Sequence, residues 1–246
     1  MLKLFYLFIT YAILGWLMEV AIVSFHKKKW TSRGFLIGPW CPIYGFGAIF
    51  ITLLLRRYYN DIWSLFVNSF ILGSVLEYLT SYIMEKIFKA RWWDYSNHKF
   101  NLNGRISLTT SLGFGALGVL VVKVFNPFFM KLPNNLPVII FNIAMIVVFL
   151  IFISDTIFSF VVISNIKKTS TNQKDITEIS TEELKKALKN KSYFNRRLLN
   201  SFPNLKFIQS KKQNKSSNDW NQIFKIKQNH KCFFIWKNTN KNYFIS

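Results

Sequence analysis

The chain has few of the residues that build disulfide frameworks and metal centres. Its 246 residues include only two cysteines, Cys41 and Cys232, and three histidines. The two cysteines lie far apart in unlike stretches of sequence, which excludes a disulfide framework. The histidines, at positions 26, 98 and 230, do not have the spacing of metal ligands. The sequence therefore predicts neither a metal centre nor any other cofactor.

Acidic residues are also scarce. The chain has 11 Asp and Glu against 32 Lys and Arg, a formal net charge of +21. Such a charge often indicates a nucleic-acid partner, but its distribution favours another reading. Residues 164–246 hold 18 of the basic residues and five acids, and most of the others lie in short connectors between apolar runs. The tail contains no recognisable nucleic-acid-binding module, so we expect the bilayer, and not nucleic acid, as the partner.

Long apolar runs fill the first two-thirds of the chain, at residues 4–25, 35–55, 62–84, 106–125 and 138–163. Each is close to the ~20 residues that a helix needs to cross the hydrocarbon core of a bilayer. Because lipid offers no hydrogen-bond partners to the backbone, such runs should be helices. The first run is too long for a signal peptide and lacks a small-residue cleavage site. We predict an all-α integral membrane protein with about five transmembrane helices.

The charges of the connectors predict an orientation for this membrane domain, residues 1–163. Nine Lys and Arg residues lie in the connectors after the first and third runs, against about five on the other side. The positive-inside rule then places the N-terminus outside and the basic tail, residues 164–246, in the cytosol. A capping-box pattern at residues 180–183 predicts a short helix near 181–191. The remaining tail is predicted to be largely disordered or to lie on the anionic inner leaflet.

Two short motifs recur within the membrane domain. Gly15-Trp16-Leu17-Met18-Glu19 resembles Ser81-Tyr82-Ile83-Met84-Glu85, and Gly45-Phe46-Gly47-Ala48 recurs unchanged as Gly113-Phe114-Gly115-Ala116. An internal duplication would give two parallel helix pairs with a fifth helix added. Chance matches in a sequence rich in Phe and Gly are the alternative.

Three acidic residues, Glu19, Glu77 and Asp155, lie inside the predicted spans, and Glu85 lies at the edge of one. Each acid inside a span costs about 2.5–3.5 kcal/mol on insertion scales. We therefore expect these side chains to face one another, a polar cavity or an arginine rather than lipid.

Two arginines, Arg33 and Arg105, precede the second and fourth runs and are suited to bind carboxylate or phosphate. One hypothesis is a cytosol-facing polar site that holds or passes a charged substrate. The other is that Glu–Arg pairs fix how the helices dock. Asp94 lies in the polar, Trp-rich connector before Arg105, which is either an interfacial anchor or a substrate gate.

Several positions favour an unusual backbone. Prolines remove amide donors, and glycines permit close approach of the chain. A broken or re-entrant start to the second helix is one interpretation, and a proline in an ordinary first helical turn is the other. The positions are Gly34, Gly38, Pro39, Pro42, Gly45 and Gly104.

The sequence resembles a family of bacterial membrane proteins described as putative type IV ABC-transporter permeases. The resemblance covers residues 6–122, is weak over the fifth run and absent from the tail. It implies a permease-like component of the bacterial plasma membrane. It depends on Glu19 after Gly15-Trp16, on Arg33-Gly34-Phe35 and Cys41-Pro42-Ile43-Tyr44-Gly45, on Glu77-Tyr78 with Thr80-Ser81 and Glu85, and on Trp92-Trp93-Asp94-Tyr95-Ser96 with Gly104-Arg105-Ile106.

The chain has no Gly-x-x-x-x-Gly-Lys-Ser/Thr loop for nucleotide phosphates, so a transporter of this kind would need a separate ATPase. Five helices form a narrow bundle, which favours a homo- or hetero-oligomer. Three functions stay open. The first is a permease subunit whose substrate passes near Glu19, Glu77 and Asp155. The second is an enzyme or binding protein for lipid headgroups, with Arg33 and Arg105 on phosphate. The third is a scaffold or sensor with a basic tail.

Overall fold

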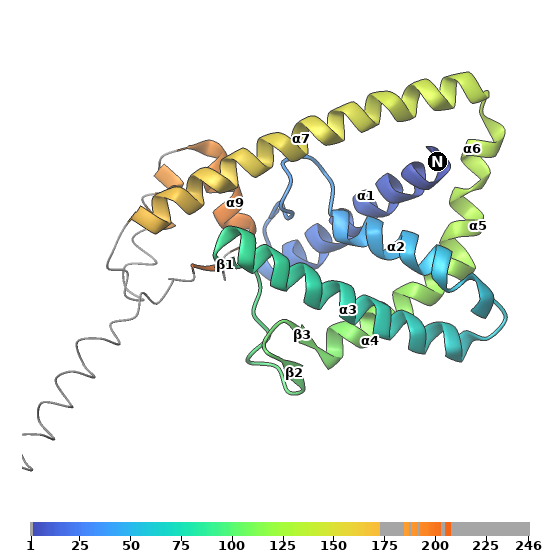
Figure 1. The fold of residues 1–246 in the computed structure, drawn as a ribbon, viewed down its shortest axis with the longest axis horizontal. Helices are drawn as coiled ribbons and strands as arrows, with labels where there is room; N and C mark the ends of the chain where they lie inside the picture. Colours follow the sequence, from blue (N-terminus) through green and yellow to red (C-terminus); the bar gives the residue numbers. More distant parts are fainter. Residues whose placement is uncertain (1, 173–184, 187, 191, 203–204, 208–246) are drawn as a thin grey trace, which may run out of the picture. The chain divides into compact units, whose positions relative to one another are not determined.

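The computed structural model describes residues 2–172, 185–186, 188–190, 192–202 and 205–207. Within these ranges, four helical stretches are long and apolar enough to cross a membrane (Figure 1). The protein is therefore an all-α membrane protein, as predicted from the sequence. The four stretches are α1 (Leu2–Lys27), α3 (Ile62–Phe88), Leu108–Asn135 and the part Val138–Ile166 of α7.

The second apolar run folds differently from the expected helix over residues 35–55. Its helix, α2, spans Pro42–Leu54 and has 13 residues. Residues 35–39 form bends instead of helix. Pro42 stands in the first turn, where its missing amide costs no hydrogen bond. The preceding amide, that of Cys41, donates to the carbonyl of Ala12 in α1 at 2.9 Å. The helix thus begins at residue 42 rather than 35.

The fourth stretch is helical with interruptions. α4 spans Leu108–Leu120 and begins with a capping box between Ser107 and Thr110. A π-helical turn, η2, follows just before Pro127, which lacks an amide and would clash with the carbonyl four residues earlier. The stretch then continues as two short helices. The elements after α4 are η2 (Val121–Phe125), α5 (Asn126–Phe129) and α6 (Lys131–Asn135).

The remaining elements are one long helix and several short ones. α7 spans Val138–Asn172 and is longer than the predicted run. In the tail, residues 185–186 and 188–190 are helical, and the other residues of the predicted 181–191 helix lie outside the described ranges. The sequence did not predict α9. The short elements are η1 (Arg56–Tyr58), α9 (Tyr193–Ser201), β1 (Ala90–Arg91), which pairs antiparallel with β4 (Lys206–Phe207), and β2 (Asn101–Leu102), which pairs antiparallel with β3 (Ile106–Ser107).

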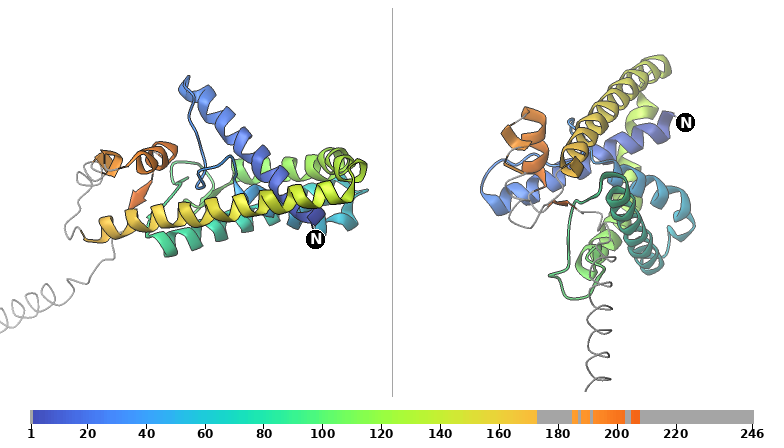
Figure 2. Two further views of the ribbon diagram at one scale, coloured as in Figure 1. Left: turned by 90° about the horizontal axis from the view of Figure 1, so that it is seen from above. Right: turned by 60° about the vertical axis from the view of Figure 1, so that its left-hand side comes forward.

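The long helices pack as two pairs. α1 packs on α2, and α3 packs on α4, while α2 also contacts α3 (Figure 1). α7 contacts both α1 and α3. Two views show α9 beside the C-terminal part of α7 (Figure 2). The contacts agree with the two helix pairs that the recurring motifs predict.

Two clusters of buried side chains hold these elements together. One joins α1, α2 and η2 and includes Leu7, Ile51 and Val121. The other joins α3, β1, α7 and α9 and includes Phe88 and Leu198.

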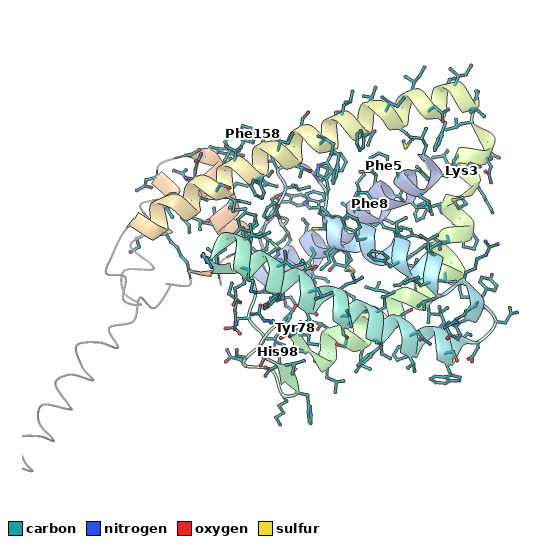
Figure 3. All side chains as sticks on the ribbon, in the orientation of Figure 1. Lys3, Phe5, Phe8, Tyr78, His98 and Phe158 are labelled. Atoms are coloured by element: carbon teal, nitrogen blue, oxygen red, sulfur yellow. The ribbon has the colours of Figure 1, made fainter. Side chains whose placement is uncertain are left out.

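A further aromatic contact fixes α9 on α7. Phe158 packs on Phe194 with ring centroids 5.1 Å apart, and Figure 3 shows Phe158 where α7 passes α9. Aromatic pairs in this edge-to-face arrangement contribute about 0.5–1.5 kcal/mol beyond their buried area. The contacts of α9 place it at the end of the helices where the first and third connectors lie.

Candidate functional site

A cavity of about 330 Å³ lies between α1, α2, α3 and α4, next to the connectors that follow α1 and α3. We call it the polar cavity. Its size is at the lower end of the range of ligand pockets. Its lining combines charged and hydroxyl groups with aromatic rings. The lining residues include Glu19, Arg33, Cys41, Tyr44, Glu77 and Tyr95, together with Phe35, Phe88, Trp93, Phe114 and Phe202.

Glu19 in α1 binds two partners at the edge of this cavity. Its Oε1 accepts a hydrogen bond from the Tyr44 hydroxyl at 2.7 Å. Its Oε2 lies 3.6 Å from Nε of Arg33. Gly15, one turn before Glu19, makes the first contact possible, because a Cβ there would lie 2.3 Å from the Tyr44 ring. The absent side chain at residue 15 lets Tyr44 reach the carboxylate.

Glu77 in α3 is the most buried acid of the cavity, with 6% of its surface exposed. It accepts hydrogen bonds from the Tyr95 hydroxyl at 3.0 Å and from Thr110 Oγ1 at 3.2 Å. Among the residues that the structure describes, no cation lies within ion-pair distance of it. Burial, and then the nearby Glu77, raise the pKa of Tyr95, so its hydroxyl stays protonated and donates.

Arg33 connects the polar cavity to the tail. Its carbonyl accepts from the Trp16 indole at 2.8 Å, and its guanidinium donates to the carbonyl of Ser201. The guanidinium also lies 5.4 Å from the ring centroid of Phe202, which lines the cavity. The end of α9 therefore closes part of the cavity wall.

A second polar cluster lies in the connector between α3 and α4. Arg105 is 7% exposed and binds Glu85 at 2.9 Å and the Ser81 hydroxyl at 3.3 Å. Arg91 binds the other oxygen of Glu85 at 3.1 Å and lies 3.8 Å from Asp94. Arg105 and Glu85 do not line the polar cavity. Both arginine–glutamate pairs dock connectors onto helices.

Asp155 in α7 forms a third polar group with the bent segment before α2. Its carboxylate accepts from the amides of Ile37 and Gly38 at 3.1 and 2.8 Å, and from the Trp40 indole at 2.8 Å. It also accepts from Ser159 at 3.1 Å. The carboxylate thus satisfies backbone donors that a helix would otherwise have paired.

The structure also places the predicted backbone positions. Gly34 and Gly104 have φ of +105° and +66°, a region that side chains rarely adopt. A Cβ on Gly38 would lie 2.1 Å from Nε1 of Trp40, and one on Gly45 would lie 2.7 Å from the carbonyl of Phe8. Pro39 is exposed within the bends. These positions allow the segment before α2 to bend and α1 to approach α2.

The sequence-predicted acids and arginines therefore fall into three groups. Glu19, Arg33 and Glu77 line one cavity. Glu85, Arg105 and Asp94 form the connector cluster, and Asp155 holds the bent segment. The predicted path past Glu19, Glu77 and Asp155 together does not match this geometry, since Asp155 does not line the polar cavity.

Sequence reasoning missed the hydroxyl partners Tyr44, Tyr95 and Thr110, and all of α9. A signal for the two tyrosines existed, because a buried carboxylate needs donors and both residues belong to the motifs quoted above. No comparable signal pointed to Phe202.

The two helix pairs carry matching ion pairs. Glu19–Arg33 and Glu85–Arg105 follow the recurring motifs, at 3.6 and 2.9 Å. In both, an indole donates to the arginine's carbonyl, from Trp16 at 2.8 Å and from Trp93 at 3.1 Å. The ion pairs recur at matching glutamates, but the indoles do not occupy equivalent positions, because the motif position that matches Trp16 is Tyr82 and Trp93 lies in the connector that follows.

The fold and cavity define a polytopic helical membrane protein with charged groups between its helices. A comparison with protein families matches residues 6–160 to the family described as "Putative ABC-transporter type IV" (ABC_trans_CmpB). The match covers more than half of the chain, and the chain belongs to this family. No curated protein and no solved structure matched the chain in the corresponding comparisons.

Proposed function

We propose that the protein is a permease-like membrane subunit that moves its substrate through the polar cavity, energised by a separate ATPase. The observation that carries this proposal is Glu77, buried in a cavity wall without a cationic partner among the described residues. An acid buried in a membrane domain is costly, and its usual justification is a substrate or ion path. Membership of an ABC-transporter family supports the same reading.

The positions of the connectors support a cytosolic opening of this cavity. Residues of both basic connectors, Arg33 and Tyr95, line the cavity, and α9 of the basic tail docks beside them. The positive-inside rule assigns these connectors and the tail to the cytosol of a bacterial plasma membrane, with the N-terminus outside. An ATPase would then reach the connectors and α9 from the cytosol.

The geometry gives less support to a site for lipid phosphate. Such a site would need Arg33 and Arg105 to converge on one anion. Arg105 is instead paired with Glu85 in the connector cluster, and Arg33 is paired with Glu19. Each guanidinium already has a carboxylate partner within this chain.

Purification from native membranes tests the proposed function. The full-length chain, tagged and solubilised in a mild detergent, should bring down an ATP-hydrolysing subunit in fixed proportion. Vanadate-sensitive ATP hydrolysis of the purified complex is the readout. Glu77→Gln should leave this association intact, because the residue lies inside the membrane domain. Purified protein without any associated ATP hydrolysis, from membranes that contain it at normal abundance, would contradict the proposal.

A further inference from the structure

A second cavity, of about 290 Å³, adjoins the polar cavity between the same four helices. We call it the apolar cavity. The two share Ile43, Tyr44 and Phe114 in their walls. Its other lining residues include Leu14, Met18 and Leu76, and it contains no charged side chain among the residues described. One end of the combined space is therefore charged, and the other is hydrocarbon-like.

The order of residues along the helices gives the combined space a direction. In α1, Tyr11 lines the apolar cavity and Glu19 the polar one, and in α3 Gly73 and Glu77 do the same. Tyr11 and Glu19 are eight residues apart, which corresponds to about 12 Å along a helix. An apolar chain of that length can extend from the polar cavity toward the centre of the helices.

The charge of the polar cavity selects the sign of a bound group. Glu19 and Glu77 supply two carboxylates and Arg33 one guanidinium, which leaves a formal charge of −1. Arg33 offsets Glu19 at 3.6 Å, so the unmatched carboxylate is Glu77. A cationic group on the ligand would supply the missing partner, whereas an anion would meet Glu77 at close range.

Aromatic side chains refine the kind of cation. Seven aromatic residues line the polar cavity, among them Trp93, Tyr95, Phe114 and Phe202. Rings that surround a carboxylate form the setting in which proteins bind alkylated ammonium groups through cation–π contacts. A strongly hydrated metal ion would gain little from such walls, and none of the described residues form a cluster of three metal ligands.

We propose that the two cavities together bind an amphiphile, with its ammonium group at Glu77 and its alkyl chain in the apolar cavity. This inference rests on the proposed function, because it takes the polar cavity as the substrate site. It adds the chemical class of the substrate. The source of the ammonium group is either a free alkylated ammonium compound or a choline-type lipid, since both carry an alkylated ammonium head and an alkyl chain.

Binding to the full-length protein in phosphatidylglycerol nanodiscs tests the inference, because that lipid brings no competing amine. The probe is radiolabelled dodecyltrimethylammonium, with retention by empty nanodiscs subtracted. We expect saturable binding that Glu77→Gln weakens about tenfold or more, the usual effect of losing a charged partner. Glu77→Asp keeps the charge and should retain most of the binding. Asp61→Asn removes a charge from the exposed start of α3 and should have no effect.

A pair of glycine variants tests the apolar cavity. Gly47 lines it, and a Cβ there would meet only Leu76, at 4.0 Å, so Gly47→Leu fills the cavity without a backbone clash. Gly113 lies in the other copy of the recurring motif, at the position that matches Gly45, and it lines neither cavity. A Cβ there would meet nothing within 4 Å. Gly47→Leu should weaken binding about tenfold, while Gly113→Leu should leave it unchanged.

Competition by unlabelled compounds distinguishes the outcomes. Displacement by dodecylphosphocholine would support a choline-type lipid, and its failure would support a free alkylammonium. Equal displacement by dodecyl sulfate or by tetramethylammonium would overturn the inference, as would unchanged binding in Glu77→Gln. The binding measurement needs no ATPase. A negative binding result would therefore overturn the amphiphile inference but not the proposed transport role, which the purification experiment tests separately. Binding without an associated ATPase would contradict the transport role alone.

Discussion

At the scale of single residues, the membrane domain places its acids in three different settings. Glu77 is buried and accepts from hydroxyl groups, half-buried Glu85 pairs with arginines, and half-buried Asp155 accepts from backbone amides. A buried carboxylate always needs partners, but the kind of partner decides what it can do. Amides and arginines of the same chain fix structure, whereas a carboxylate that accepts only from side-chain hydroxyls stays available to a ligand.

Asp155→Asn tests the structural role of the α7 acid. The amide that replaces one oxygen cannot accept a hydrogen bond, so at least one donor of the bent segment loses its partner. We expect the free energy of unfolding to fall by about 1–3 kcal/mol and the melting temperature to fall by several degrees. Thermal unfolding in detergent is the measurement. Ser154→Ala is the matched control, since that hydroxyl donates to Leu150 within its own helix. Equal melting temperatures for both variants would refute this role.

At the scale of secondary-structure elements, α9 docks on the connector that carries Arg33. Arg197 donates to the carbonyl of Ile37 at 2.7 Å and to the Ser32 hydroxyl at 3.4 Å. Ser201 donates to the carbonyl of Ser32 at 2.8 Å. Burial lowers the pKa of Arg197, and the nearby Asp155 opposes that shift. These contacts bring Phe202 to the cavity wall.

Arg197→Ala should loosen α9, because it removes the side-chain bonds to residues 32 and 37. We expect the amides of Leu198 and Leu199, which are buried in the wild type, to exchange hydrogen about tenfold faster. Hydrogen-exchange mass spectrometry in nanodiscs measures this. Arg196→Ala changes the exposed neighbour and should leave the rates unchanged. Identical exchange in both variants would show that Arg197 does not hold α9.

Much of the fold could be predicted from the sequence, and the site only in part. Apolar length and backbone chemistry are local properties, so the long helices followed directly from the runs. The start of α2 did not follow, since Asp155, more than a hundred residues away, satisfies the amides of the bent segment. Glu19 and Glu77 line one cavity, in agreement with the predicted path, but the separation of Asp155 from that cavity and the role of Tyr95 depend on packing between elements distant in sequence.

At the scale of the whole membrane domain, two helix pairs enclose one space between them. The two basic connectors, after α1 and after α3, both contribute to the polar end of this space. Arg33 comes from the first connector and Tyr95 from the second. The opposite end of α1 lies near α6, where Lys3 donates to Asn134 at 2.8 Å. Transport through the polar cavity, as proposed, thus requires that this cavity opens to the cytosolic side of the membrane.

The cysteine at residue 41 provides the most direct test, because it lines the polar cavity and is half-buried. With Cys232→Ser as background, a membrane-impermeant thiol reagent is applied to inside-out and right-side-out vesicles. We expect Cys41 to react in inside-out vesicles alone, and faster after Phe202→Ala opens the cavity wall. Reaction from the outside, alone or as fast as in inside-out vesicles, would contradict a polar cavity open to the cytosol.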